Sequence, residues 1–266
     1  MEFTVTKHGS DLWRYNESDG LYSSVDAYLI VGTMRAALVD TLQSLQPISL
    51  AAQIREITPL PVDVLLTHGH SDHVGAEVAN LAASDGFTIH MSHEDITIAQ
   101  NALEPNFRMD VFHDIKDGSV FNLGETKLEA IRVAGHTPGS MVFLDCDNKR
   151  CFTGDAFGVW LQLEHSLPMS LYVEELKRFE KMLAYIPETL LWGGHLYQSE
   201  GIALNATFVT HMREACELIL SGKLVGQEVK FTPEIAKDPV AIMTINARIA
   251  QYKSVKALTY KETRLR

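Results

Sequence analysis

Three histidines and one aspartate stand within six residues, directly after the apolar stretch 62–66: His68, His70, Asp72 and His73. Imidazole and carboxylate groups are the ligands that Zn²⁺ takes in proteins, and Fe and Mn accept the same groups. Two ligands one residue apart, followed by two adjacent ligands, do not all reach a single tetrahedral ion without strain. The spacing therefore favours a turn that serves two neighbouring metal ions.

Three more candidate ligands each follow a glycine at the end of an expected strand: His136, Asp155 and His195. A loop histidine or a turn aspartate is the simpler interpretation of each one taken singly. Taken with the first cluster, they place single donors at the ends of successive strands, as a metal centre at one edge of a sheet needs. The glycine before each donor permits the tight turn that would aim its side chain.

Short apolar or alternating runs, separated by glycine and proline, predict strands in two clusters. The first cluster covers 11–15, 24–31, 35–40, 62–66 and 88–91, and the second covers 119–123, 127–133, 141–146, 150–153, 189–192 and 255–260. Helical spacing predicts helices at 48–57, 74–83, 94–103, 173–184, 203–220 and 238–249. Two groups of strands with helices between them predict one layered α/β domain.

The composition is that of a globular protein with an excess of acid. The 266 residues are 46% hydrophobic and 21% charged, with a formal net charge of −11. A sizeable core is therefore available, and wholesale disorder is excluded. Binding a polyanion needs clustered Lys and Arg, so the negative charge argues against nucleic acid as a partner. The 3 cysteines do not make a disulfide scaffold in a chain of this length.

The N-terminal residues and the hydropathy predict a cytoplasmic protein without a membrane partner. The N-terminus has no basic segment followed by an apolar stretch and a small-residue cleavage site, so we expect no signal peptide. No window of the sequence approaches about 18 consecutive apolar residues, so we expect no transmembrane helix.

Four motifs follow one another along the chain: His-x-His-x-Asp-His at 68–73, Gly-His-Thr-Pro-Gly-Ser at 135–140, Gly-Asp at 154–155 and Gly-His at 194–195. In this order they resemble the metallo-β-lactamase superfamily of metal-dependent hydrolases, and the resemblance runs from Leu12 to about Tyr197. It implies an α/β fold, a four-layer αββα sandwich with C-terminal helical elements. We therefore expect a single metallo-β-lactamase-like domain over 1–266, with 200–266 as a C-terminal helical extension.

The resemblance also implies a role for each candidate ligand. His68, His70 and His136 match the ligands of a first metal ion. A second ion is matched by Asp72, His73 and His195, and Asp155 matches the carboxylate that bridges both ions. The expected cofactors are two divalent metal ions, Zn first, with Mn or Fe as the alternatives.

The resemblance implies a zinc-dependent metallohydrolase that cleaves a small ester-like bond, namely a thioester, lactone or amide. Two adjacent ions lower the pKa of a shared water toward about 7, so the hydroxide attacks without a serine or cysteine nucleophile. Asp72 is expected to steer the hydroxide or its proton as well as to ligate. Tyr197 is expected to point its hydroxyl at an oxyanion. The apolar segment between Asp155 and His195 either walls a pocket or forms ordinary core: Phe157, Trp160, Leu161, Leu163, His165, Leu167, Pro168, Met169 and Tyr172.

Other functions share this ligand set. A mononuclear-iron oxidoreductase of the persulfide dioxygenase type and some phosphodiesterases have the same fold, and a metal-stabilised binding protein would keep the ligands without turnover. About two Zn or Mn per chain would indicate the hydrolase, and one Fe with oxygen consumption would indicate the oxidoreductase. The expected partner is a small-molecule substrate. The C-terminal helices either pair two chains into a homodimer or cap the pocket.

Overall fold

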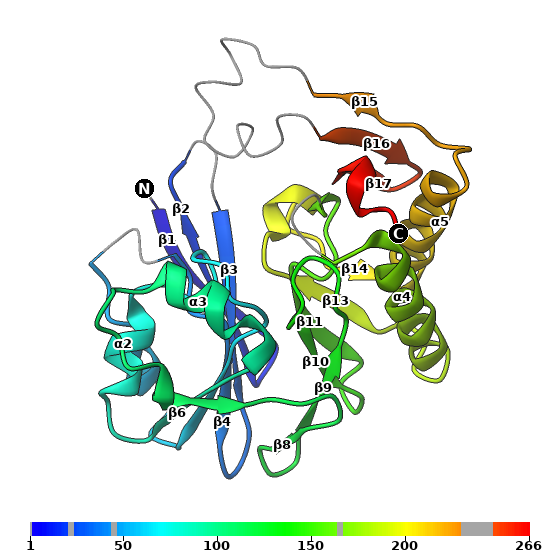
Figure 1. The fold of residues 1–266 in the computed structure, drawn as a ribbon. Coiled ribbons are helices and arrows are strands. Elements are labelled where there is room, and N and C mark those ends of the chain that lie inside the picture. The colour runs from blue at the N-terminus through cyan, green and yellow to red at the C-terminus, as the bar shows by residue number, and fades with distance from the viewer. Residues whose placement is uncertain (1, 21–23, 44–46, 164–166, 230–246) are drawn as a thin grey trace.

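Two β-sheets lie face to face in the centre of the molecule (Figure 1). The computed structural model describes residues 2–20, 24–43, 47–163, 167–229 and 247–266. The first sheet has seven strands in the spatial order β1 (Glu2–His8), β2 (Leu12–Ser18), β3 (Ser24–Val31), β4 (Ala36–Val39), β5 (Val62–Leu65), β6 (Phe87–Met91) and β7 (Phe112–Asp114). The second has six, in the order β14 (Leu204–Asn205), β13 (Leu190–Gly193), β11 (Arg150–Gly154), β10 (Met141–Asp145), β9 (Lys127–Arg132) and β8 (Val120–Asn122).

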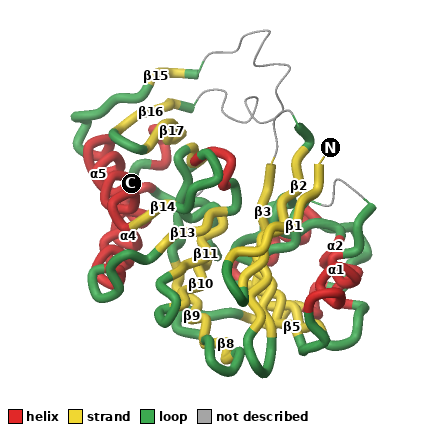
Figure 2. Tube along the Cα trace, turned by 180° about the vertical axis from the view of Figure 1, so that it is seen from behind, coloured by secondary structure: helices red, strands yellow, loops and turns green. Residues whose placement is uncertain are grey.

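Helices cover the outer face of each sheet, as the two opposite views show (Figures 1 and 2). The first sheet carries α1 (Leu50–Ile57), α2 (Glu77–Ala82) and α3 (Ile96–Ala102), and the second carries α4 (Met169–Leu183) and α5 (Ala206–Leu220). One apolar core lies under each helical layer and a third lies between the sheets. The expected α/β fold, a four-layer αββα sandwich, is confirmed.

The strand sequences account for these layers, because alternate side chains of a strand face opposite sides of its sheet. In β3, Leu29 packs under the helices, whereas Tyr28 and Ile30 pack between the sheets. Both faces of the strand are therefore covered, which is why its sequence reads as a nearly continuous apolar run.

The two longest helices are amphipathic and cover one face of the second sheet. α4 buries Tyr172, Leu176, Phe179 and Leu183, which recur every three or four residues on one side of the helix. α5 begins after Asn205, whose side chain accepts a hydrogen bond from the backbone N–H of Phe208. At 15 residues each, both are shorter than the roughly 20 residues that cross a bilayer. No membrane-spanning helix occurs in the part of the chain that the structure describes.

The C-terminal part is mixed, which corrects the expected helical extension over 200–266. After α5 the described chain forms strands β15 (Gln227–Glu228), β16 (Arg248–Tyr252) and β17 (Val255–Tyr260), which join β12 (Trp160–Gln162) in a third sheet. Most of the helix predicted at 238–249 lies outside the described residues, and its last two positions belong to β16. β17 pairs in parallel with β12, a partner far away in sequence that no local pattern reveals.

Parallel strands bring several loops to one edge of the sandwich. β4, β5 and β6 run parallel in the first sheet, as do β11 and β13 in the second. The loops after β5, β11 and β13 carry the candidate ligands, and these loops are fixed by strands whose ends stay open. Short 3₁₀ turns complete the chain: η1 (His93–Asp95), η2 (Met109–Val111), η3 (Leu196–Ser199) and η5 (Glu262–Arg264).

Replacing Phe143 by alanine tests the core between the sheets. The side chain is fully buried in β10, so Phe143→Ala is expected to lower the free energy of unfolding by about 3–5 kcal/mol through lost burial and the cavity left behind. Urea denaturation measures the change. The control Val120→Ala alters a side chain that is 58% exposed and should change stability by no more than about 0.5 kcal/mol. An equal cost in both variants would contradict the two-sheet core.

Candidate metal centre

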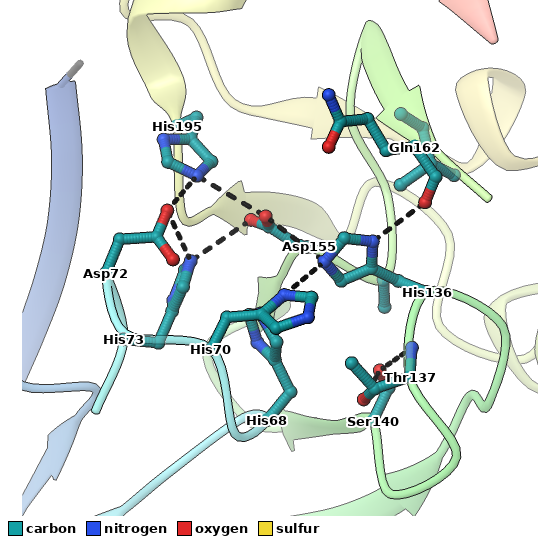
Figure 3. Close-up of polar contacts among 12 residues, drawn as sticks. His68, His70, Asp72, His73, His136, Thr137, Ser140, Asp155, Gln162 and His195 are labelled. Carbon is teal, nitrogen blue, oxygen red and sulfur yellow. Dashed lines mark hydrogen bonds and ion pairs between the residues drawn. The ribbon is translucent and has the colours of Figure 1, made fainter. Parts of the chain in front are cut away.

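Seven side chains from four loops converge where the loop ends of the two sheets meet (Figure 3). The loop after β5 supplies four of them, and the loops after β9, β11 and β13 supply one each. All seven come from the residues predicted as ligands: His68, His70, Asp72, His73, His136, Asp155 and His195. Their convergence agrees with the sequence, and the assignment of each to a particular ion stays a prediction.

Three imidazoles form the first group of donors. Nδ1 of His70 lies 3.1 Å from Nε2 of His68 and 2.9 Å from Nε2 of His136. The donor atoms of all three lie within 4.8 Å of one another. Three imidazole nitrogens at this spacing match the protein ligands of an open tetrahedral site, in which a fourth position stays free for water or substrate.

The second group combines two imidazoles with a carboxylate. Nε2 of His195 lies 3.3 Å from Oδ2 of Asp72, and His73 completes a set whose donor atoms again lie within 4.8 Å. Asp155 stands between the groups, because its Oδ2 is 3.3 Å from Nε2 of His195 and 3.7 Å from Nε2 of His136. Asp155 therefore lies within reach of a member of each group, and its role as the bridging carboxylate stays a prediction.

Backbone carbonyls orient two of the imidazoles from behind. Nδ1 of His136 donates to the carbonyl of Gln162 at 2.9 Å, and Nδ1 of His195 donates to the carbonyl of Ser24 at 2.7 Å. Because a carbonyl only accepts, the proton of each neutral ring must sit on Nδ1. The lone pair of Nε2 then points into the centre of the site, which is the form that binds a metal ion.

A buried carboxylate, Asp40, orients two more of the five rings. Oδ2 of Asp40 lies 2.8 Å from Nδ1 of His73 and 2.9 Å from the hydroxyl of Thr67, which donates to it. The same hydroxyl lies 3.0 Å from Nδ1 of His68, and since its proton is already used it accepts from that ring. Asp40 follows β4, so the first sheet fixes two ligands through one carboxylate. Sequence reasoning missed this residue, because it carries no motif of its own.

A second buried carboxylate, Asp95, ties together two ligand loops. It accepts from the backbone N–H of Gly69 at 2.9 Å and of Gly139 at 2.7 Å, and from the hydroxyl of Thr137 at 2.6 Å. Gly69 lies between two ligands of the first cluster, and Thr137 follows His136. Asp95 was also missed. One feature of the sequence could have pointed to it: Asp95 comes shortly after β6, a strand that runs parallel to β5 and therefore ends near the same loops.

Two of the glycines beside ligands are required by geometry. Gly154 has a φ of +47° and a Cβ there would lie 2.2 Å from the Thr67 hydroxyl oxygen. A Cβ on Gly194 would lie 2.4 Å from the His73 ring, so this glycine provides room between ligands rather than an unusual turn. Gly154 therefore permits the unusual backbone before Asp155, and Gly194, which lies in the predicted turn before His195, leaves room for the His73 ring.

Burial keeps part of the cluster uncharged. It lowers the pKa of His70 to about 4, with the nearby His136 as the next cause. Burial and the neighbouring imidazoles also hold the pKa of His68 well below its ordinary value. Both rings are therefore neutral at pH 7, which is the state required of a metal ligand.

Neighbouring carboxylates favour the protonated, charged form of two other histidines in the cluster, His73 and His195. Burial would lower the pKa of His73 and His195, but the carboxylates around them raise both well above the ordinary value. Burial would likewise raise the pKa of Asp72 and Asp155, but the histidines beside them hold both pKa values well below the usual range. Without bound metal, the site at neutral pH thus contains two imidazolium groups against two carboxylates.

The residues fit a pair of divalent cations, and the surroundings of one buried atom support this directly. Nε2 of His73 is buried without a hydrogen-bond partner among the described residues, and its closest carboxylate oxygen, on Asp155, is 3.4 Å away. An unpartnered buried nitrogen is costly unless something else takes its place. A cation between His73 and Asp155 would satisfy both, and the donor set of nitrogen and oxygen suits Zn, Fe or Mn.

A comparison with protein families supports this interpretation. Residues 22–195, well over half of the chain, match the family model described as the metallo-beta-lactamase superfamily. The chain belongs to the metallo-beta-lactamase superfamily. The matched region contains every candidate ligand, and membership of this superfamily implies divalent metal ions.

Curated relatives within the superfamily include a hydroxyacylglutathione hydrolase from Fuscovulum blasticum. It is 32% identical over 167 residues, which cover 61% of this chain and 58% of that protein. The chain spans about half to two thirds of the length of the curated relatives it matches.

Solved structures show the same fold. A metallo-beta-lactamase from Pontibacter korlensis superposes with a TM-score of 0.62 at 18% identity, covering 80% of this chain and 98% of that one. TTHA1623 in a di-iron-bound form superposes with a TM-score of 0.55 at 25% identity, covering 70% of this chain and 92% of that one.

Tyr197 lies beside the metal centre on η3 and is 39% exposed. Its ring packs edge to face on His195, with centroids 6.2 Å apart. Its role toward an oxyanion stays a prediction. Of the apolar segment predicted to wall a pocket or form core, Phe157, Trp160 and Leu161 line a cavity that reaches Asp155 and His195, whereas Leu163, Met169 and Tyr172 belong to the core. His165 lies outside the described residues.

Removing the carboxylate of Asp95 is expected to loosen both ligand loops. Asp95→Ala should weaken metal binding by about 10- to 100-fold, because three donors lose their shared acceptor. Competition with a chelator measures the affinity. The control Asp110→Asn alters an exposed surface pair with Arg108 and should bind metal as the wild type does. A folded Asp95→Ala variant with unchanged metal affinity would show that Asp95 does not position the ligands.

Metal loading at pH 7 should release protons. His73 and His195 have raised pKa values and must lose a proton to ligate, whereas His68, His70 and the carboxylates are already deprotonated. We expect about two protons per chain from these rings, in addition to the proton lost by a metal-bound water, and the contribution of the rings should fall as the pH rises above their pKa values. Calorimetric titration in two buffers of different ionisation enthalpy measures it. Loading without proton release at pH 7 would contradict the charge distribution described above.

Proposed function

We propose that the protein is a dinuclear metal-dependent hydrolase that cleaves a small ester-like bond, namely a thioester, lactone or amide. The single observation that carries the proposal is the closure of two three-donor groups beside Asp155, with the buried Nε2 of His73 next to that carboxylate. The second group, which includes Asp72 and His195, offers donors for a second ion. A single-iron oxidoreductase of this fold shares the ligand set, and the hydroxyacylglutathione hydrolases among the relatives favour hydrolysis over it.

Two divalent ions held by these groups would supply a water activated to hydroxide at neutral pH and would polarise the carbonyl oxygen of the substrate. The chain's own residues hold the donor atoms still, because Asp40, Asp95 and two carbonyls fix the ligand loops before any substrate arrives. Asp72 is the more exposed of the two carboxylates, at 29% against 18% for Asp155. It is therefore the carboxylate that ligates and also steers the hydroxide or its proton.

Substrate class follows from charge and from the relatives. A net charge of −11 disfavours nucleic acid and favours a small-molecule substrate. The matched hydroxyacylglutathione hydrolases are named for hydrolysis of a thioester, and we extend hydrolysis of an ester-like bond to this chain. Zn is the proposed metal, with Mn and Fe as the alternatives, since a neighbour of the same fold is titled as di-iron-bound.

Metal analysis together with a substrate panel tests the proposal. We expect about two divalent ions per chain and hydrolysis of at least one thioester, lactone or amide. His68→Ala and Asp155→Ala should each lower kcat/KM by at least about 100-fold while circular dichroism shows a retained fold, because each removes a ligand without touching the sheets.

Asp110→Asn is the matched control, since it removes a carboxylate charge at the surface and should leave turnover unchanged. One Fe per chain with oxygen consumption would replace the proposal by the mononuclear oxidoreductase. Bound metal without turnover on the whole panel, phosphodiesters included, would indicate a binding protein.

A further inference from the structure

Two exposed aromatic rings stand beside the metal centre. Trp160 is 52% exposed, and its ring meets that of Tyr197 edge to face with centroids 6.3 Å apart. Tyr197 in turn packs against the ring of His195 at 6.2 Å. These two side chains form a surface that we call the aromatic shelf. It begins at a proposed metal ligand and faces solvent.

Backbone pairing with β17 holds β12, the strand that carries Trp160, in place. β12 runs parallel to β17, with Trp160 opposite Ala257. The carbonyl of Val159 accepts from the backbone N–H groups of Lys256 and Ala257, each at 2.9 Å. β17 lies beyond residues 22–195, the part shared with the family. A segment outside that shared region therefore supports the strand that carries Trp160.

The cavity next to the shelf is mainly apolar. It is small, and Asp155 and His195 line it together with Val159, Leu161 and Leu204. No Lys or Arg lines it in the part of the chain that the structure describes. A carboxylate or phosphate of a ligand would find no cation along these walls, whereas an apolar group would lose only its contact with water.

We propose that the aromatic shelf, next to the apolar lining of this cavity, binds a neutral, apolar acyl group, so that the preferred substrates are thioesters or esters with an aromatic or medium-length acyl chain. This inference rests on the proposed hydrolase function. The acyl substituent is bonded to the carbon that is attacked, so it lies close to the ligand His195 and hence to the shelf. Contact with the rings of Trp160 and Tyr197 removes apolar surface of both partners from water.

Thioesters of N-acetylcysteamine test the proposal, because they share one small neutral leaving group and release a thiol that is easily assayed. The acyl series is acetyl, glycolyl, hexanoyl and phenylacetyl. Metal-loaded wild type is expected to show a kcat/KM at least about 10-fold higher for phenylacetyl than for acetyl or glycolyl. Trp160→Ala should reduce this ratio by about 10-fold, and Trp160→Phe should keep most of it.

Tyr185→Ala is the matched control, since it removes an aromatic ring that is 88% exposed and does not line the cavity. It should keep the wild-type ratio. If thioesters are hydrolysed but Trp160→Ala leaves the ratio unchanged, the shelf is overturned and the hydrolase function stands. If the wild type hydrolyses none of the series or of the wider panel, the proposed function itself fails.

Binding of product acids gives a readout that needs no turnover. In calorimetric titrations of metal-loaded protein, phenylacetate is expected to bind wild type about 10-fold more tightly than it binds Trp160→Ala, while acetate binds both alike. Thermal unfolding of each variant checks that the fold is intact. Equal affinity of phenylacetate for the two proteins would overturn the proposal.

Discussion

Asp40 has its carboxylate buried at the end of β4, between a hydroxyl and an imidazole that it orients. Its other oxygen accepts from the backbone N–H of Thr67, at the point where β5 gives way to the ligand loop. A buried carboxylate without such partners would be strongly destabilising, so the loop and the carboxylate depend on each other. The convergence of the other loops requires that this first one be fixed. Asp95 then extends the same arrangement to the loop that carries His136.

Placing so many ionisable groups together in a buried space costs free energy, and bound cations would lower that cost. Five imidazoles and two carboxylates lie together in a largely buried space, where unpaired charge is expensive. The protein meets part of this cost by pairing charged His73 and His195 with Asp72 and Asp155. Cations replace these pairs with stronger ones. Metal binding and folding stability are therefore coupled, since whatever binds only the folded state stabilises it.

Local sequence patterns predicted the parts of the molecule whose causes are local. Alternation and apolar runs placed the strands at 24–31 and 255–260 with the observed bounds, and motif order predicted the sandwich and seven candidate ligands that the structure brings together. The sequence did not reveal β12, whose partner β17 comes about a hundred residues later. Asp40 and Asp95 were missed for a similar reason, because each acts on residues 26 to 44 positions away. The described part of the expected helical extension contains α5 and also strands, because β15 to β17 join β12 in a third sheet whose pairing is not local.

The parallel pairing of β12 with β17 also has a consequence for how the protein matures at the ribosome. Strands β1 to β13 and their ligand loops precede residues 255–260 in the chain, so all the donor groups are synthesised before β17 can pair with β12. The carbonyl of Val159 gains its two N–H partners only after residues 256 and 257 have left the exit tunnel. A nascent chain would thus acquire its metal-binding groups before the strand that carries Trp160 is held in place. Substrate selection would mature later than metal binding.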